Sequence, residues 1–343
     1  MSVRQIQMLP AEILDTIPGI YTWGMDVIRA VQSIQSPALT SIMTFINELG
    51  TVKIYFPLIL FFFWWIDEKK GLRLGILVLV SIWLNIFMKD AFRQPRPFFL
   101  DPSLGLAEEM SFGFPSGQAK IVLCFWMPVA AWLSELKQKI YWSRIVWAMA
   151  ISLTILISFS SIYLGLYFPT DILAGWAIAG TILAFCFFLG PVFMKLSSNI
   201  SPRLYNIFIA LIALTMNGLY TADRSLPALF LGFSIGYIIM KNRFPFSAQE
   251  DIKGKKPGLA IMAVRCLIGF LGLAIIFIGL RLILPGEGSL FRNIHNWGIG
   301  SPYFDLGQFI SYSLLGFWAS AGAPRVFQQM GLANNPAGEE SEE

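Results

Sequence analysis

The feature that most constrains the fold is a series of apolar stretches, each long enough to cross roughly 30 Å of hydrocarbon. Only 13% of the 343 residues are charged and 56% are hydrophobic, which leaves too little charge to cover a water-soluble domain of this size. We therefore expect an all-α, polytopic helical bundle in a membrane. We place about nine spans, at 46–66, 72–90, 117–134, 144–161, 171–194, 204–219, 226–240, 258–283 and 304–322.

The distribution of basic residues predicts an orientation in the membrane. Lysine and arginine concentrate in alternate loops, at 69–73, 137–144, 195–203 and 241–256. By the positive-inside rule these loops lie on the cytoplasmic side. The loops at 91–116 and 162–170 then open on the opposite, extracytoplasmic side of what we predict to be a plasma or inner membrane.

Three short polar motifs lie in or beside those two loops. The first is Lys89, six intervening residues and then Arg96-Pro97, and the second is Pro115-Ser116-Gly117-Gln118. The third runs from Ser160-Ser161 to Asp171, with Tyr167 four residues before that aspartate. In order and spacing they resemble K-x6-R-P, P-S-G-H and S-R-x5-H-x3-D, the signature of the type-2 phosphatidic acid phosphatase superfamily. The first motif alone would be a weak signal, whereas the three in order are specific.

The resemblance implies a binding site for the phosphate of a lipid. Lys89 would supply a point charge, and Arg96 a guanidinium that can bind two phosphate oxygens at once. Ser116 and Gly117 would form a turn whose hydroxyl and backbone N–H groups hold the remaining oxygens. Ser161 stands where the family has its second arginine. Lys120, one turn after Ser116, is a weaker candidate to replace that guanidinium.

The resemblance also assigns three catalytic positions, and two of them have lost the family's histidine. Gln118 stands where a proton donor is expected, but an amide cannot deliver a proton at neutral pH. Tyr167 stands at the position of the nucleophile, and an unactivated tyrosine is a poor nucleophile. Asp171, one helical turn on, is placed to accept a hydrogen bond from Tyr167. We therefore expect a catalytically degenerate site.

Simpler interpretations of these residues remain open. Lys89 and Arg96 are also explained as interfacial residues that extend their charge toward water. Asp171 is also explained as a helix N-terminal carboxylate favoured by the helix dipole. Arg93, Glu108 and Glu109 are expected to be solvated loop charges. His295, the only histidine, is far from the motifs in sequence and is not expected to take part in catalysis.

The resemblance divides the chain into four predicted parts. Residues 1–45 would form N-terminal, partly interfacial helices, and 46–195 the phosphatase-like transmembrane core. Residues 196–330 would add transmembrane helices, and 331–343 would form a disordered acidic tail.

The function we predict is binding of a phosphorylated lipid at an extracytoplasmic site. One alternative is an active lipid phosphatase or phosphotransferase, acting on phosphatidate or a polyprenyl phosphate by an altered mechanism. A second alternative is a lipid or phosphate transporter. The expected partners are a phosphate-bearing lipid and the bilayer, with no nucleic acid. We expect no metal and no other cofactor, because the cysteines lie in apolar stretches without metal-ligand spacing.

Overall fold

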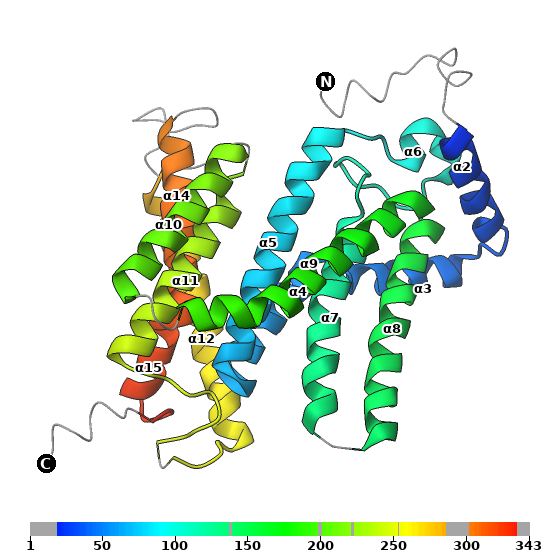
Figure 1. Ribbon diagram of the computed structural model, residues 1–343. Coiled ribbons are helices and arrows are strands. Elements are labelled where there is room, and N and C mark those ends of the chain that lie inside the picture. The colour runs from blue at the N-terminus through cyan, green and yellow to red at the C-terminus, as the bar shows by residue number, and fades with distance from the viewer. Residues whose placement is uncertain are drawn as a thin grey trace, which may run out of the picture. The chain divides into compact units, whose positions relative to one another are not determined.

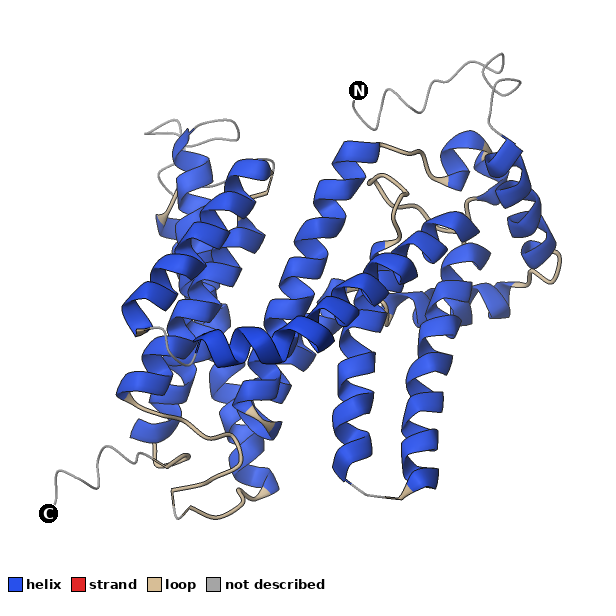
Figure 2. Ribbon diagram, viewed as in Figure 1, coloured by secondary structure: helices blue, strands red, loops and turns tan. Residues whose placement is uncertain are grey.

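The computed structural model describes residues 19–136, 139–197, 201–220, 223–252, 254–285 and 302–334. Within these ranges every regular element is helical and no strand occurs (Figure 2), which confirms the all-α class. His295 and most of the predicted acidic tail, residues 335–343, lie outside the described residues.

The helices follow one another with short connections. They are α2 (Gly19–Gln32), α3 (Pro37–Glu48), α4 (Val52–Phe61), η2 (Phe62–Ile66), α5 (Glu68–Phe92), α6 (Pro97–Leu100), η3 (Pro102–Leu104), α7 (Gly117–Leu136), α8 (Ile140–Tyr163), α9 (Pro169–Ser197), α10 (Pro202–Leu219), α11 (Ser225–Arg243), α12 (Leu259–Ile283), α14 (Pro302–Phe317), η4 (Trp318–Gly322) and α15 (Ala323–Gln329).

Several of these helices are long and apolar enough to cross a membrane, as expected for an integral, multi-pass membrane protein. Among the described residues five qualify, namely Glu68–Leu100, Gly117–Leu136, Ile140–Tyr163, Pro169–Gly190 and Leu259–Ile283. A sixth is possible if Pro37–Glu48 and Val52–Ile66, bent by 46°, count as one span. The other three predicted spans are helical, in α10, α11 and α14 with η4, but they are not among these candidates. The predicted count of nine is therefore larger than the five or six that length and composition support.

The chain forms two compact units. Unit 1 comprises residues 1–55 and 84–191, and unit 2 comprises 56–83 and 192–343. All three polar motifs belong to unit 1. The predicted boundary between residues 45 and 46 falls inside α3, which runs on to Glu48.

Unit 1 is built around a pair of antiparallel helices, α7 and α8 (Figure 1). Its N-terminal helices α2 and α3 both pack against α8. The apolar face of α2 is buried, because Met25 and Ile28 contact Leu104 and Phe168 beside the third motif. This contact fixes the loops that carry the motifs on one end of the α7–α8 pair.

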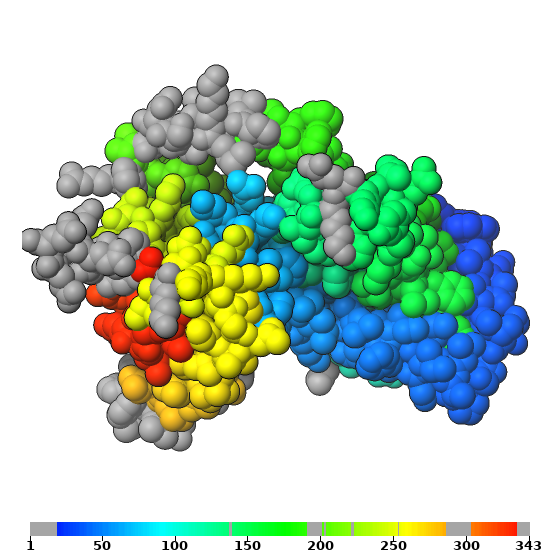
Figure 3. All heavy atoms as spheres, turned by 90° about the horizontal axis from the view of Figure 1, so that it is seen from below, coloured from blue at the N-terminus to red at the C-terminus, as the bar shows by residue number. Residues whose placement is uncertain are grey.

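Unit 2 has its closest helix packing between α11 and α14, which lie side by side in Figure 1. At Gly232 the two backbones approach so closely that an added Cβ would overlap the carbonyl of Ser313. Only glycine permits this approach, and the surface it buries is mostly apolar. In Figure 3 the red segment that contains α15 packs directly against the yellow segment that contains α12.

Candidate functional site

Arg96 connects the first motif with the loop that follows it and with the third motif. The residue precedes α6, and its side chain is completely buried. Its Nε donates a hydrogen bond to the carbonyl of Ser111 at 2.7 Å, and Nη1 donates to the carbonyl of Leu166 at 2.8 Å. These main-chain partners fix the plane of the guanidinium and leave Nη2 to face side chains.

Lys89 and Arg96 meet at the hydroxyl group of Tyr167. The Lys89 Nζ lies 3.4 Å from this oxygen and the Arg96 Nη2 lies 3.3 Å from it. The guanidinium also stacks over the Tyr167 ring, 4.4 Å from the ring centroid. Buried cations beside a membrane need partners of this kind. The structure thus places two of the predicted phosphate ligands beside the residue at the nucleophile position.

Glu109 is a carboxylate paired with both of these cations. Its Oε1 lies 2.6 Å from Arg96 Nη2 and 3.7 Å from Lys89 Nζ, and it accepts a hydrogen bond from Ser111 Oγ at 2.7 Å. Burial raises the pKa of Glu109, but Arg96 and Lys89 outweigh it and hold that pKa below its ordinary value. Glu109 was expected to be a solvated loop charge, and its side chain is 41% exposed, but it is also paired with both cations. Sequence reasoning missed it because a glutamate in a polar loop carries no sign of its partner.

The second motif leads into α7, as expected. A main-chain hydrogen bond connects it to the third motif. The Ser116 N–H donates to the carbonyl of Asp171 at 3.0 Å. The buried Ser116 hydroxyl accepts from the N–H of Ala119 at 3.4 Å. Gly117 sits against Asn85, whose amide donates to the carbonyl of Pro115 at 3.0 Å. Among the described contacts, Ser116 and Gly117 therefore serve the start of the helix.

Gln118 and Ser161 form a separate polar cluster with Asn47 of α3. The Asn47 amide donates to Ser161 Oγ at 2.7 Å, and the Gln118 amide donates to Asn47 Oδ1 at 2.9 Å. Ser161 in turn donates to Gln118 Oε1 at 3.0 Å. The positions of the family's proton donor and second arginine are thus joined to each other. The sequence analysis did not name Asn47 as a site residue. The signal that could have identified it is a polar asparagine within the predicted apolar span 46–66.

Asp171 and Lys120 are buried, and neither contacts the phenol of Tyr167 through a described hydrogen bond. The Asp171 carboxylate instead accepts the N–H of Phe168 at 2.9 Å, which is the capping role considered as its simpler interpretation. Lys120 lies one turn into α7, and its N–H approaches the carbonyl of Ser116 at 3.4 Å.

Gly165 gives the third motif its turn. Its φ of 71° lies in the left-handed region, and an added Cβ would overlap the carbonyl of Leu104. In the loop after the first motif, the Leu106 N–H donates a hydrogen bond to the carbonyl of Leu164, the residue before Gly165, at 3.2 Å. This close approach holds the loop after the first motif against the third motif, so that both reach the same place.

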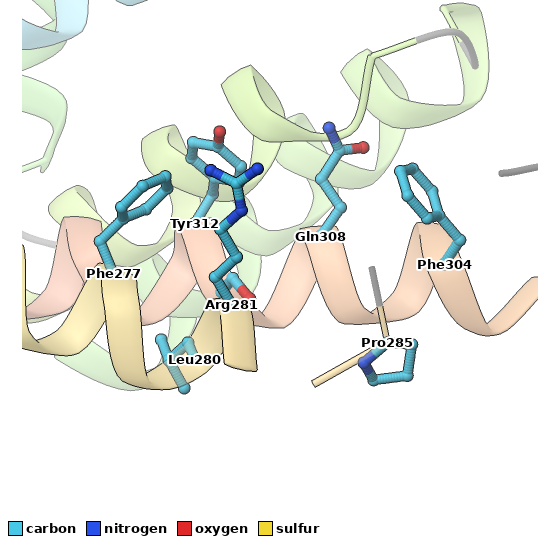
Figure 4. Close-up of a pocket in the computed structure, with 8 residues that line it drawn as sticks. Phe277, Leu280, Arg281, Pro285, Phe304, Gln308 and Tyr312 are labelled. Carbon is cyan, nitrogen blue, oxygen red and sulfur yellow. The ribbon is translucent and has the colours of Figure 1, made fainter. Parts of the chain in front are cut away.

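A cavity of about 280 Å³ lies elsewhere, between α12 and α14 of unit 2. Figure 4 shows the Arg281 side chain beside Tyr312, with Gln308 and Phe304 farther along the same wall. None of the predicted site residues lines this cavity. The candidate site is therefore the motif cluster of unit 1.

Comparison with known proteins agrees with the motifs. Residues 70–195 match the PAP2 superfamily, and residues 225–335 match the transmembrane extension of PAP2 superfamily phosphatases. The first match contains all three motifs. The second covers three of the four spans predicted after the core, 226–240, 258–283 and 304–322, and begins after the span 204–219.

Two characterised relatives are lipid phosphatases. Phosphatidylglycerophosphatase B of Bacillus subtilis is 30% identical over 162 residues, which are 46% of this chain and 77% of that protein. The undecaprenyl-diphosphatase of Sulfolobus acidocaldarius is 27% identical over 163 residues, which are 47% of this chain and 75% of that protein.

A solved structure is also similar, the transmembrane PAP2-type phosphatidylglycerolphosphate phosphatase from Bacillus subtilis. It is 26% identical, with a TM-score of 0.45, over 56% of this chain and 92% of that one. The predicted resemblance is confirmed by the family matches and the relatives, and the chain belongs to the PAP2 superfamily, the superfamily of type-2 phosphatidic acid phosphatases.

Proposed function

We propose that this protein binds the phosphate group of a membrane lipid through Lys89 and Arg96 and does not hydrolyse it. One observation carries the proposal: both cations are directed at a single anionic oxygen, Glu109 Oε1, at 3.7 and 2.6 Å. A phosphate oxygen is an acceptor of the same charge and similar size, so the same donors suit it. Arg96 is completely buried, which strengthens its attraction for an anion.

The residues at the catalytic positions support binding without turnover. Covalent phosphoryl transfer needs an activated nucleophile and a proton donor. Gln118 cannot donate a proton as an acid, and its amide is already engaged with Asn47 and Ser161. The Asp171 carboxylate accepts the backbone N–H of Phe168, and no hydrogen bond among those described joins it to the Tyr167 hydroxyl.

The lipid we propose carries a phosphate monoester or diphosphate headgroup, such as phosphatidate or a polyprenyl phosphate. The names of the two relatives specify lipids of these kinds. We place the site on the extracytoplasmic side of a plasma or inner membrane, since the basic loops predict that orientation. Residues 46–195 would form the binding core and 196–330 an accessory helical part.

The test uses protein reconstituted into liposomes. Phosphate release is measured from phosphatidate, phosphatidylglycerophosphate and undecaprenyl diphosphate, and binding of dioctanoyl phosphatidate is measured by calorimetry in detergent. We expect saturable binding together with phosphate release no greater than that of empty liposomes. Absence of binding, or steady turnover of any of the three lipids, contradicts the proposal.

A second candidate is a phosphatase or phosphotransferase that uses Tyr167 as its nucleophile. The observation in its favour is that the Tyr167 hydroxyl lies 3.4 Å from Lys89 Nζ and 3.3 Å from Arg96 Nη2, the groups that would hold the phosphoryl oxygens. Phosphate release that disappears in Tyr167→Phe, with lipid binding retained, would establish this function in place of the first.

A further inference from the structure

The Glu109 carboxylate occupies the point where the two cations converge. Arg96 Nη2, Lys89 Nζ and Ser111 Oγ all lie within 3.7 Å of Glu109 Oε1. The other donors of Arg96 are fixed on the carbonyls of Ser111 and Leu166. A second anion at this point would compete with the carboxylate for Arg96 Nη2 and would be repelled by it.

The Glu109 side chain is able to leave without unfolding a helix and without breaking the bond between Arg96 Nε and the carbonyl of Ser111. Residues 105–116 contain no helix, and two main-chain hydrogen bonds bracket Glu109. Leu106 donates to Leu164 at 3.2 Å on one side, and Gly113 donates to Gln94 at 2.9 Å on the other. The Glu109 side chain is 41% exposed, while Arg96 is fully enclosed. The anion thus stands at the water-facing side of the cations, where an incoming headgroup arrives.

We infer that Glu109 is an internal ligand of the phosphate site, displaced when a lipid phosphate binds, and that it sets which anions can occupy the site. This inference rests on the proposed function. Every ligand must displace the same carboxylate, so the apparent affinity for each is lowered by the same factor. A doubly charged phosphate monoester binds these cations well enough to remain bound. A singly charged phosphodiester, the headgroup type of ordinary bilayer lipids, is kept out.

The test compares Glu109→Gln with wild-type protein, using dioctanoyl phosphatidate as the monoester probe and dioctanoyl phosphatidylglycerol as the diester probe. Glutamine keeps the size of the side chain and removes its charge. We expect both affinities to rise by a common factor of about ten or more, the value of one charge-assisted hydrogen bond. Glu108→Gln is the matched control, since Glu108 is the neighbouring, exposed glutamate, and its affinities should equal those of wild type.

Three results would overturn the inference. Unchanged affinities in Glu109→Gln would mean that the carboxylate does not compete. Lower affinities would mean that Glu109 holds the two cations in place for the ligand. A gain for only one probe would mean that Glu109 stays beside the bound headgroup instead of leaving.

A second measurement keeps the two proposals separate. Amide hydrogen exchange across 107–110 should accelerate when dioctanoyl phosphatidate binds to wild-type protein, and exchange that is unchanged or slower contradicts displacement. If Arg96→Gln abolishes phosphatidate binding while Glu109→Gln leaves it unchanged, only the role of Glu109 fails. If Arg96→Gln has no effect on phosphatidate binding, whether introduced into wild-type protein or into Glu109→Gln, the proposed function itself fails.

Discussion

Each of the two units buries an arginine completely, and the two side chains are held in different ways. In unit 2, Arg265 donates hydrogen bonds to the main-chain carbonyls of Ala248, Glu250 and Leu332. In unit 1, Arg96 also uses two main-chain carbonyls, but its Nη2 faces the side chains of Ser111, Tyr167 and Glu109.

The difference is the one expected between an arginine that only holds the fold and, under the proposed function, an arginine that binds a phosphate. Main-chain carbonyls cannot leave Arg265 unless the surrounding chain unfolds, so that residue joins α12 to the segments at 248–250 and 332. A carboxylate on a loop can leave Arg96 while the rest of the guanidinium stays fixed. Under the proposed function, the same residue type at the same burial would have two different roles, and variants of each residue test this difference.

The largest effect is expected for Arg265→Gln. The change leaves buried carbonyls without their donors, at 1–3 kcal/mol for each unsatisfied group, so we expect a loss of about 3 kcal/mol or more in folding free energy. Thermal unfolding in detergent measures it, with Arg281→Gln on the exposed end of the same helix as control. Phosphatidate affinity of the folded variant should not change, and a specific loss of affinity would contradict the comparison.

Arg96→Gln should weaken binding more than it weakens the fold. Removing a charge-assisted hydrogen bond is worth about 1.5–3 kcal/mol, so the affinity for dioctanoyl phosphatidate should fall by roughly 10- to 150-fold. Calorimetry measures the change, and Lys139→Gln, an exposed basic residue of the same unit, should bind like wild type. An equal loss in both variants would indicate nonspecific attraction to basic loops.

Gln118→Met tests the separate polar cluster of unit 1. Methionine keeps the length of the side chain but leaves Asn47 and Ser161 without the Gln118 amide. We expect a loss of about 1–2 kcal/mol in stability and no change in phosphatidate affinity. If the affinity fell while the unfolding temperature stayed constant, Gln118 would belong to the phosphate site.

The smallest effect is a pH dependence from Glu109, which faces Lys89, Arg96 and Tyr167. Because its pKa is lower in the folded state than in the unfolded chain, its stabilising contribution is present above the ordinary pKa near ~4.3 and is lost as pH falls through the lowered value. The unfolding temperature of wild type should therefore fall more below about pH 4 than that of Glu109→Gln. Parallel curves would show that the ion pairs contribute nothing to stability.

The sequence predicted the helices better than the contacts of the polar residues. Eight of the nine predicted spans coincide with helices, because apolar composition and length act locally, whereas 46–66 is interrupted at 49–51 between α3 and α4. The criterion for crossing a membrane is more restrictive: α11 has 19 residues, ten of them buried, and lies in the part that matches the transmembrane extension, yet it is not among the candidate spans. Hydropathy alone does not distinguish a buried helix from a lipid-facing one.

The sequence by itself determined the all-α class, the membrane character and the family, because these depend on composition and on short motif spacings. The tertiary structure decided the partners of each polar side chain. Asn47 and Ser161, for example, are 114 residues apart and share a hydrogen bond. Such contacts depend on how α3, α7 and α8 pack. For the same reason only the folded chain reveals Glu109 as the anion beside Lys89 and Arg96, since charge attracts through space and not along the sequence.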